Sequence, residues 1–446
     1  MEFYKKLLLS SVLLCVASMG IIILFAMNFN PIVTDTISIN NDTEGGISGA
    51  IANASNGDII LLNSGNYTGI NNTGITINKS ITLKGKDSTD TVIIDAQDIT
   101  RIFELDNNLN ITFANIIFIN ANASGNGGAI NNPNNNTRMK FIDCTFTNNK
   151  VAKTTNSDGF GGAIYNNGFM GLTDCTFNNI NASSSGGAIY NNGSTIRVYD
   201  LELLQKFLNL FFNENNIKNS IDHGLVDCTF NNISASDSGG AIYNTGSGLG
   251  FVDCFFNDIS ADGDGGAVFN TGSGLGFVDC SFTNISASGS GGAVYNDGSG
   301  LGFVDCSFND ISASGSGGAV FNNGSGMGLV DCSFADISAS GNGGAVFNTG
   351  SGMGLVGSIF ANISADGDGG AIFSDGSGLG FVDCSFTDIS AGGDGGAIFS
   401  DGSGLGLVGS IFTNISADDG QTISGDNKVN GVDCTFINIT TTNNRS

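Results

Sequence analysis

The stretch GGAIYNTGSGLGFVDCFFNDISADGD, residues 239–264, decides the fold. Closely similar copies follow it at a strict period of 26 residues. Self-similarity at such a period is typical of repeat architectures, in which one unit is too short to bury a core and stacked units bury a continuous one. The copies start at Gly265, Gly291, Gly317, Gly343, Gly369 and Gly395.

One unit contains short apolar segments broken by Gly, Ser, Asn and Asp, with no helical spacing of apolar residues. Leu249 and Phe251 alternate as in a strand, and so do Cys254 and Phe256, but the two series are out of phase. This mismatch predicts a bend at Asp253-Cys254. Three or so short strands then form one coil, and coils stack as parallel sheets about 4.8 Å apart. The sequence predicts an all-β fold, a right-handed parallel β-helix of roughly fourteen coils.

Each position of the unit lies beside its own copy in the next coil, so columns of equivalent residues are informative. An Ile/Val column fits the interior, and an Asn/Asp column fits a bend, where these residues tolerate left-handed φ. A mostly Asn column, continued by Ser374 and Ser400, fits stacked amides that hydrogen-bond along the helix axis. The three columns are Ile242, Val268, Val294, Val320, Val346, Ile372 and Ile398; Asn232, Asp258, Asn284, Asp310, Asp336, Asn362, Asp388 and Asn414; and Asn244, Asn270, Asn296, Asn322 and Asn348.

All cysteines except Cys15 fall in one further column, whose position holds Ser358 and Ser410 in two coils. The exchange for Ser favours a small interior position with free thiols. A few disulfides between adjacent coils are the alternative, although a Cβ separation of about 4.8 Å would strain them. No His joins the column, so neither a metal site nor a cofactor is expected. The column is Cys144, Cys175, Cys228, Cys254, Cys280, Cys306, Cys332, Cys384 and Cys434.

Residues 1–30 differ from the rest of the chain. Lys5 and Lys6 precede an uncharged apolar run, residues 7–27, that is long enough to cross a bilayer as a helix. The charge placement puts the remainder of the chain outside the cytoplasm. An uncleaved signal anchor is favoured, which predicts a membrane-anchored extracellular β-helix. A cleaved signal peptide and a secreted protein are the alternative.

Residues 31–125 are expected to form an N-terminal cap and irregular first coils. Gly46–Ser55 has helical spacing and could close the first coil. Residues 126–446 form the repeat β-helix, with an insertion at about 199–223, where Leu201–Glu214 is expected to be a surface helix or a degenerate coil. Strands are expected at Asp58–Leu62, Ile75–Ile77, Ile81–Leu83, Val92–Ile94, Ile102–Leu105 and Ile111–Phe113.

The net charge of −26, with 15 Lys and Arg, argues against nucleic acid as a partner, because nucleic acid requires a basic face. It suits a self-repelling exterior outside the cell. N-x-S/T sequons fit an exported chain, but those at Asn284 and Asn414 belong to the bend column and are expected to be poorly accessible.

The repeats carry a resemblance to known families. GGAIYN followed by VDCTFNN resembles the GGAI and FxxN repeats of chlamydial polymorphic outer-membrane proteins, and more closely the adhesin-like surface proteins of methanogenic archaea. The opening stretch, NGDIILLNSGNYTG through SITLKGKDSTDTVIIDA, is similar to the first coils of the pectin-lyase-like fold. Most coils read FxN rather than FxxN and no C-terminal membrane barrel follows, which favours the N-terminal anchor over autotransporter-style export. The resemblance implies a β-helix at the cell surface.

The pectin-lyase-like fold also implies an alternative, a polysaccharide lyase or glycoside hydrolase acting on uronate-containing polymers. Such enzymes are expected to combine Ca²⁺-binding carboxylates with a basic residue, or clustered Asp with His. Here Arg101, Arg138 and Arg197 are scattered, and His223 is the only histidine. The turns Asp262-Gly-Asp264 and Asp366-Gly-Asp368 could supply Ca²⁺ ligands, but the same turn reads Ser-Gly-Ser elsewhere. A non-catalytic adhesin-like or wall-associated structural protein is therefore favoured.

A column of aromatic residues lies next to the Ile/Val column. Adjacent residues of a strand point to opposite faces, so if Ile242 is inside, Tyr243 points out. The column predicts a long stripe of exposed rings about 4.8 Å apart, which either stabilises the sheet by stacking or binds a glycan, a host or neighbour cell-surface molecule, or another copy. Its members are Tyr165, Tyr190, Tyr243, Phe269, Tyr295, Phe321, Phe347, Phe373 and Phe399.

Overall fold

The structure is a computed structural model that describes residues 34–86, 91–155, 158–193, 224–418, 421–425 and 430–441. The expected membrane segment at residues 7–27, the expected helix Leu201–Glu214 and His223 lie outside these ranges. Within the ranges, no helix has the length and apolar character needed to cross a membrane.

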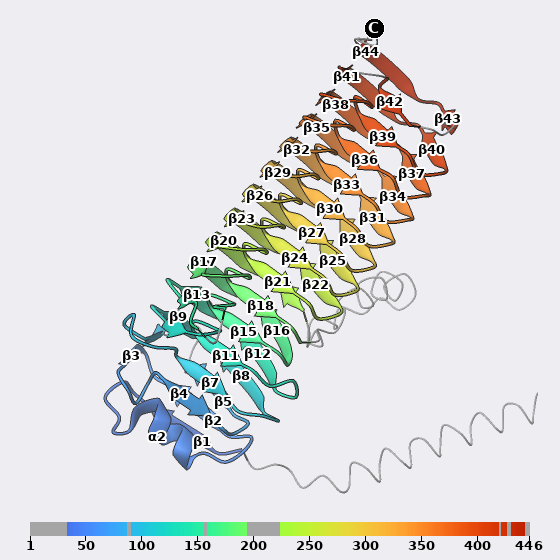
Figure 1. The fold of residues 1–446 in the computed structure, drawn as a ribbon. Helices are drawn as coiled ribbons and strands as arrows, with labels where there is room; N and C mark the ends of the chain where they lie inside the picture. The colour runs from blue at the N-terminus through green and yellow to red at the C-terminus, as the bar shows by residue number, and fades with distance from the viewer. Residues whose placement is uncertain are drawn as a thin grey trace, which may run out of the picture.

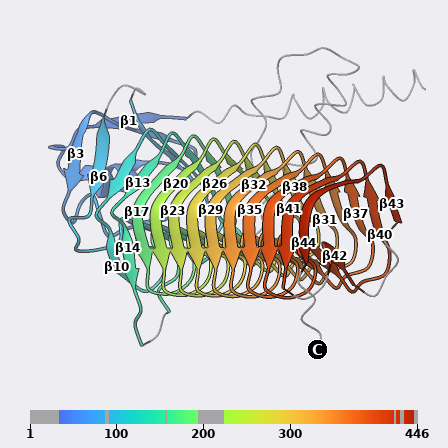
Figure 2. The ribbon, with the colours of Figure 1, turned by 90° about the horizontal axis from the view of Figure 1, so that it is seen from above.

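The described chain winds into an elongated parallel β-solenoid with one strand of each of three sheets in nearly every coil (Figures 1 and 2). Sheets A and C contain 15 and 13 strands, and sheet B contains 16, of which β10 and β14 lie off its main path. These numbers confirm the predicted parallel solenoid of roughly fourteen coils. We call residues 34–193 the N-terminal coils and residues 224–418 the shaft.

Sheet A follows the order β1 Thr36–Ile39, β2 Ile59–Leu62, β5 Thr82–Gly85, β8 Asn110–Ala114, β12 Arg138–Ile142, β16 Phe169–Thr173, β19 Leu225–Val226, β22 Leu249–Val252, β25 Leu275–Val278, β28 Leu301–Val304, β31 Met327–Val330, β34 Met353–Val356, β37 Leu379–Val382, β40 Leu405–Val408 and β43 Asn430–Val432.

Sheet B follows the order β3 Gly65–Thr68, β6 Val92–Asp95, β9 Ile117–Ile119, β13 Thr145–Thr147, β17 Thr176–Ala182, β20 Thr229–Ala235, β23 Phe255–Ala261, β26 Ser281–Ala287, β29 Ser307–Ala313, β32 Ser333–Ala339, β35 Ile359–Ala365, β38 Ser385–Ala391, β41 Ile411–Ala417 and β44 Thr435–Thr441, with β10 Asn122–Ser124 pairing β14 Lys150–Ala152 beside it.

Sheet C follows the order β4 Ile75–Ile77, β7 Phe103–Leu105, β11 Ile130–Asn132, β15 Ile164–Asn166, β18 Ile189–Asn191, β21 Ile242–Asn244, β24 Val268–Asn270, β27 Val294–Asn296, β30 Val320–Asn322, β33 Val346–Asn348, β36 Ile372–Ser374, β39 Ile398–Ser400 and β42 Ile423–Ser424.

A single short helix, α2 (Gly46–Asn53), covers the first coil at the N-terminal end of the described chain (Figure 1). Ile47, Ala50 and Ile51 are buried against the core. The Lys79 ammonium donates hydrogen bonds to the carbonyls of Ile51, Ala52 and Ala54 at 2.9, 2.7 and 2.6 Å, which satisfies acceptors that a helix C-terminus leaves open. The predicted helical cap is confirmed.

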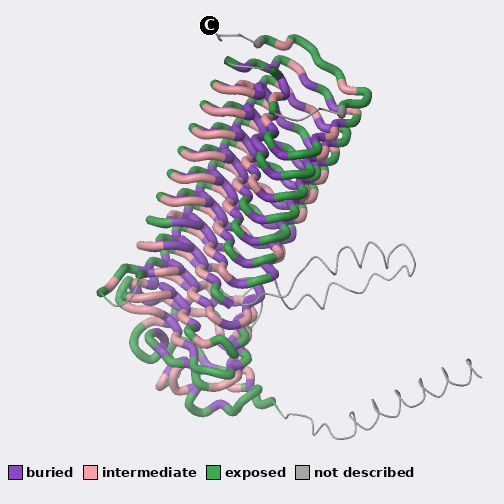
Figure 3. Tube along the Cα trace, turned by 45° about the vertical axis from the view of Figure 1, so that its right-hand side comes forward, coloured by how far each residue is buried: buried purple, intermediate pink, exposed green. Residues whose placement is uncertain are grey.

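Equivalent residues of successive shaft coils pair directly, as Ile242 with Val268 does in sheet C. The whole Ile/Val column is buried, and sheet B adds an interior stack of phenylalanines such as Phe282, Phe308 and Phe334, whose ring centroids are 4.7 and 4.6 Å apart. Figure 3 shows this buried interior running the length of the solenoid. The core therefore continues from coil to coil, as the repeat predicted.

Two columns hold the backbone bends. The Asn/Asp column has left-handed φ throughout, from 52° at Asn232 to 56° at Asp388, as predicted. The Asp253 position is also left-handed, with φ 52°, and in two coils it is occupied by Gly357 (φ 62°) and Gly409 (φ 64°). Asp and Gly therefore exchange there because both tolerate this conformation.

The expectation that Asn284 and Asn414 are poorly accessible is wrong. Both residues are exposed, because the bend lies on the outside of the coil. Their amides lie along the helix axis and donate hydrogen bonds to Asp258 and Asp388 of the preceding coil.

The third column is a buried ladder of asparagines. From Asn166 to Asn322, each Nδ2 donates to the Oδ1 of the next coil and to the carbonyl of the glycine two residues on, as Asn244 does to Asn270 (2.6 Å) and Gly246 (2.6 Å). The ladder begins at Asn132 in the N-terminal coils and ends at Ser374, which accepts from Asn348. Its amides are thus satisfied inside the core, as buried polar groups require.

The described cysteines are free, and all but the half-buried Cys434 are buried. In most coils Sγ contacts the carbonyl two residues earlier, as Cys228 does with Val226 at 3.3 Å. Burial raises the pKa of the Cys384 thiol, so it stays protonated at neutral pH. These thiols act as small core residues.

Candidate binding surface

The aromatic column occupies the middle position of the three-residue strands of sheet C, from Tyr165 in β15 to Phe399 in β39. The first and third residues of each strand, such as Ile242 and Asn244, are buried, so the middle side chain points away from the core. Consecutive centroids are 4.7–5.3 Å apart and the planes differ by at most 14°. The column is one continuous ring stack.

The rings are less exposed than the sequence suggested. All are half-buried except Phe373, which is buried with 8% of its surface exposed. Each ring covers the faces of its neighbours, so ring edges rather than faces reach solvent. Phe399 lies in register with Ser424, so only its side facing Phe373 is covered by an aromatic ring. We call the outer edge of this stack the aromatic ridge.

Polar side chains border the aromatic ridge. One border is formed by the residues that come directly after the strands of sheet C. There Asn323 donates a hydrogen bond to Asp297 at 3.1 Å, and Thr349 donates one to Asn323 at 2.5 Å. Burial, followed by Asp297 and Asp264, raises the pKa of Tyr295 to about 12. The ridge therefore combines apolar edges, neutral tyrosine hydroxyls and carboxylates.

The turns that precede sheet C form a second polar ladder. The Asp264 carboxylate accepts a hydrogen bond from the Ser290 N–H at 2.7 Å, and Asp368 accepts from the Asp394 N–H at 2.7 Å. The side chain in this position thus satisfies the backbone of the next coil. Among the described residues, no three His, Cys, Asp or Glu side chains are grouped as a metal site would need.

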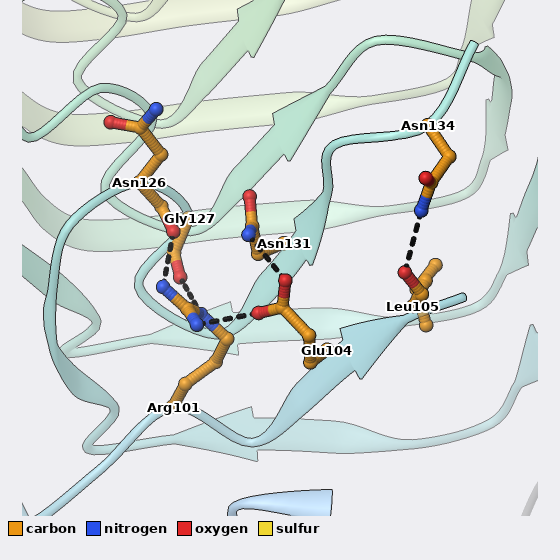
Figure 4. Close-up of polar contacts among 7 residues, drawn as sticks. All are labelled: Arg101, Glu104, Leu105, Asn126, Gly127, Asn131 and Asn134. Carbon is orange, nitrogen blue, oxygen red and sulfur yellow. Dashed lines mark hydrogen bonds and ion pairs between the residues drawn. The ribbon is translucent and has the colours of Figure 1, made fainter. Parts of the chain in front are cut away.

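A charged network lies at the N-terminal base of the ridge, where Glu104 and Asn131 take the column position that Tyr165 takes in the next coil (Figure 4). The Arg101 guanidinium donates to Glu104 at 2.6 Å and to the carbonyls of Asn126 and Gly127 at 2.6 and 2.9 Å. Glu104 also accepts from Asn131 at 2.7 Å.

This network was missed at the sequence level. Burial lowers the pKa of Arg101, partly offset by Glu104, and all three nitrogens of its guanidinium are engaged. Asn131 Oδ1 is buried and makes no hydrogen bond within the described structure. The register of sheet C could have indicated this network, because Glu104 and Asn131 occupy the position of the aromatic column in the two coils before Tyr165. The network ties the irregular coils to the first GGAI turn.

Parts of this chain resemble a known family of repeats. The Chlamydia polymorphic membrane protein (Chlamydia_PMP) repeat matches residues 143–167, 174–192, 227–245, 279–297, 357–375 and 383–401. The chain carries polymorphic membrane protein repeats. Each matched segment ends just beyond the strand of sheet C that bears the aromatic column. A search of curated proteins returns no match.

Several solved structures have a similar course of the chain. A mannuronic acid specific polysaccharide family 6 lyase from human gut microbiota is 11% identical, with a TM-score of 0.47 over 90% of this chain and 83% of that one. The tailspike protein 3 of bacteriophage CBA120 is 12% identical, with a TM-score of 0.40 over 88% and 58%. A PL6 family lyase from Pseudopedobacter saltans is 12% identical, with a TM-score of 0.40 over 90% and 92%.

Proposed function

We propose that the chain is a non-catalytic cell-surface protein, adhesin-like or wall-associated, whose solenoid presents the aromatic ridge to a glycan or to a molecule of a neighbouring cell. The resemblance to adhesin-like surface proteins of methanogenic archaea and the export of the chain through residues 7–27 are part of the proposal. The observation that carries it is the unbroken outward ring stack from Tyr165 to Phe399, borne on polymorphic membrane protein repeats.

The form of the ridge favours an elongated partner. The ring edges repeat at the coil spacing, so one contact can recur in every coil and weak contacts can add along the axis. Because ring faces are covered, a sugar ring cannot stack on the middle of the ridge and would contact edges and hydroxyls there. Face stacking is available only at an end, such as the side of Phe399 that lies toward Ser424.

The test replaces Phe321, Phe347 and Phe373 by Ser. A binding role predicts lost adhesion to cells or immobilised glycans with a nearly unchanged melting temperature. As a matched control, Val356, Val382 and Val408 are replaced by Ser, because they are also partly exposed apolar residues but lie on sheet A. A large fall in melting temperature with no separate binding defect would show that the rings only stabilise the sheet.

A polysaccharide lyase or hydrolase acting on uronate polymers is the alternative. It is tested by incubating the purified protein with pectin and other polyuronates, with and without Ca²⁺, and measuring chain length. Robust cleavage would make the protein an enzyme and reverse the proposal.

A further inference from the structure

Basic side chains are confined to one part of the described molecule. The shaft has Asp in every coil but no Lys, Arg or Glu. The Lys and Arg side chains of the described residues all lie in the N-terminal coils, where Arg101, Lys150 and Lys153 each pair with a carboxylate. Lys79 caps α2. Arg138 and Lys140 both line a hollow.

That hollow, which we call the groove, crosses the outer side of sheet A at the start of its early strands and has a volume of about 610 Å³. Its lining comes from the turn before β2, from β5 and the residues before it, from β8 and from β12. Four adjacent coils contribute, so it extends along the solenoid for about 14 Å at the usual strand spacing. The polar and basic side chains that line the groove are Asn56, Ser80, Thr82, Asn110, Thr112, Arg138 and Lys140.

The chemistry of the lining is specific. Hydroxyl and amide groups of Ser, Thr and Asn can both donate and accept hydrogen bonds, whereas the two cations only donate. Among the described residues that line the groove there is no Asp or Glu, although acidic residues outnumber basic ones in the whole chain. The Arg138 guanidinium carbon lies 4.3 Å from the centroid of the Phe169 ring, a cation–π contact that holds the exposed guanidinium in one place.

We infer that the groove binds a short anionic oligosaccharide. The planar guanidinium of Arg138 matches a carboxylate or sulfate, and Lys140 adds a second positive charge. The Ser, Thr and Asn side chains match sugar hydroxyls. The volume lies within the range of small-ligand sites and admits a slender chain. It is too small for the acidic shaft of a second copy, which is three sheets wide.

The neighbouring coils show that the groove is local. In sheet A the outward position of Thr112 and Lys140 is taken by Gly171 in the next coil, and in the shaft by glycines such as Gly250 and Gly276. No side chain stands there to contact a ligand. The groove thus differs in place and chemistry from the aromatic ridge on sheet C. An experiment can therefore disprove binding at one of the two sites without affecting the other.

The test measures binding of the full-length chain to three oligosaccharides by isothermal titration calorimetry. Oligogalacturonate supplies carboxylates, a sulfated oligosaccharide supplies sulfates, and a neutral oligogalactan supplies neither. Short oligosaccharides are used because a long polyanion would be repelled by the acidic shaft. We expect an anionic oligosaccharide to bind and the neutral one not to bind, and the preferred anionic probe identifies the charged group.

The decisive variant is Arg138→Gln/Lys140→Gln, for which we expect at least about tenfold weaker binding. Lys150→Gln/Lys153→Gln is the matched control, since it removes the same charge from the same coil but on the side of β14, and it should bind like the wild type. Arg138→Lys keeps the charge but loses the planar fork and should fall between the two.

Circular dichroism of each variant checks the fold. Equal weakening in both double variants, equal binding of the neutral oligosaccharide, or no anionic binding at all would overturn the inference. Association of the chain with itself that depends on Arg138, without saccharide binding, would also overturn it and would make the shaft of a second copy the partner.

Discussion

One outward position of sheet A carries Thr82, Thr112 and Lys140 in the early N-terminal coils, whereas from Gly171 onward and throughout the shaft it carries glycine. The interiors of the two regions are much more alike. The stacked Phe113 and Phe141 of the first region have centroids 5.1 Å apart, close to the spacings in the shaft, and the asparagine ladder runs through both. Repetition therefore conserves the inside, which each coil must share with its neighbours, and the two regions differ on the outside.

This difference has a consequence for binding. A surface made of identical coils offers the same contact many times and suits a long partner or a repeated weak contact. A site where different groups converge on one ligand needs coils that differ, and in the described chain the N-terminal coils have this property. The aromatic ridge is of the first kind and the groove is of the second.

The largest effect is expected when a buried ring is removed from the core, and this substitution tests whether the interiors of the two regions are equivalent. Phe308→Ala in the shaft and Phe113→Ala in the N-terminal coils each remove a fully buried ring and should cost about 3–5 kcal/mol locally. The outward Phe321→Ser should cost much less, because that ring is half-buried. Native-state hydrogen exchange of amides in the mutated and adjacent coils measures the local cost, since a long solenoid need not unfold in one step.

If Phe113→Ala opened its coils far more easily than Phe308→Ala opened those of the shaft, the interiors would not be equivalent. The two regions would then differ in the stability of their cores as well as in their surfaces.

A smaller effect is expected in the asparagine ladder. Asn296 Nδ2 donates to Asn322 at 2.8 Å and to the Gly298 carbonyl, and its Oδ1 accepts from Asn270 at 2.7 Å. Asn296→Leu would leave these buried partners unsatisfied and should cost about 2–3 kcal/mol by the same exchange measurement. Asn296→Ser should cost less, because Ser occupies the column at Ser374. Equal losses would show that packing volume, not hydrogen bonding, keeps Asn in this column.

The fold was largely predictable because each residue type recurs in register. The bend at Asp253, the buried Ile242 and the amide ladder all followed from the 26-residue repeat and from the two-residue alternation of strands. The αL conformation of the Asp253 position could also have been found, since Gly357 and Gly409 replace Asp there.

The sites were less predictable, because they depend on contacts between coils that do not repeat. Strand β3, rich in polar residues, was missed, as were β10 and β14. Arg101 meets Asn126 and Gly127 across a full coil, and the groove collects residues from four irregular coils. The outward direction of Tyr243 followed from alternation, but the covering of each ring by the next required the actual ring orientation.

A third prediction concerns the bends, which both regions share: Asp143 has φ 50° and Asp305 has φ 53°. Asp305→Gly should be nearly neutral, because Gly takes this position in two other coils. Asp305→Ala should cost about 1 kcal/mol, since a Cβ without a polar group is disfavoured in the left-handed region. The same pair of substitutions at Asp143 should give the same order. A stable Asp305→Ala with a destabilised Asp305→Gly would mean that the carboxylate and not the backbone selects Asp.

The smallest effect uses the tyrosines of the ridge, one in each region. Burial raises the pKa of Tyr190 to about 12, and that of Tyr295 also reaches about 12, where Asp297 and Asp264 add to burial. Unfolded tyrosine has a pKa of about 10. The folded state therefore holds the proton more tightly, so this stabilisation is complete below pH about 10 and is lost as the pH rises from about 10 to 12.

Asp297→Asn should lower the pKa of Tyr295 while leaving it above 10, because burial is the larger cause, and should leave the pKa of Tyr190 unchanged. Titration of isotope-labelled tyrosines by NMR measures both groups. A pKa of Tyr295 that did not move would show that the carboxylates bordering the shaft are too well solvated to act on the ridge, and the acidic exterior would then matter for long-range repulsion only.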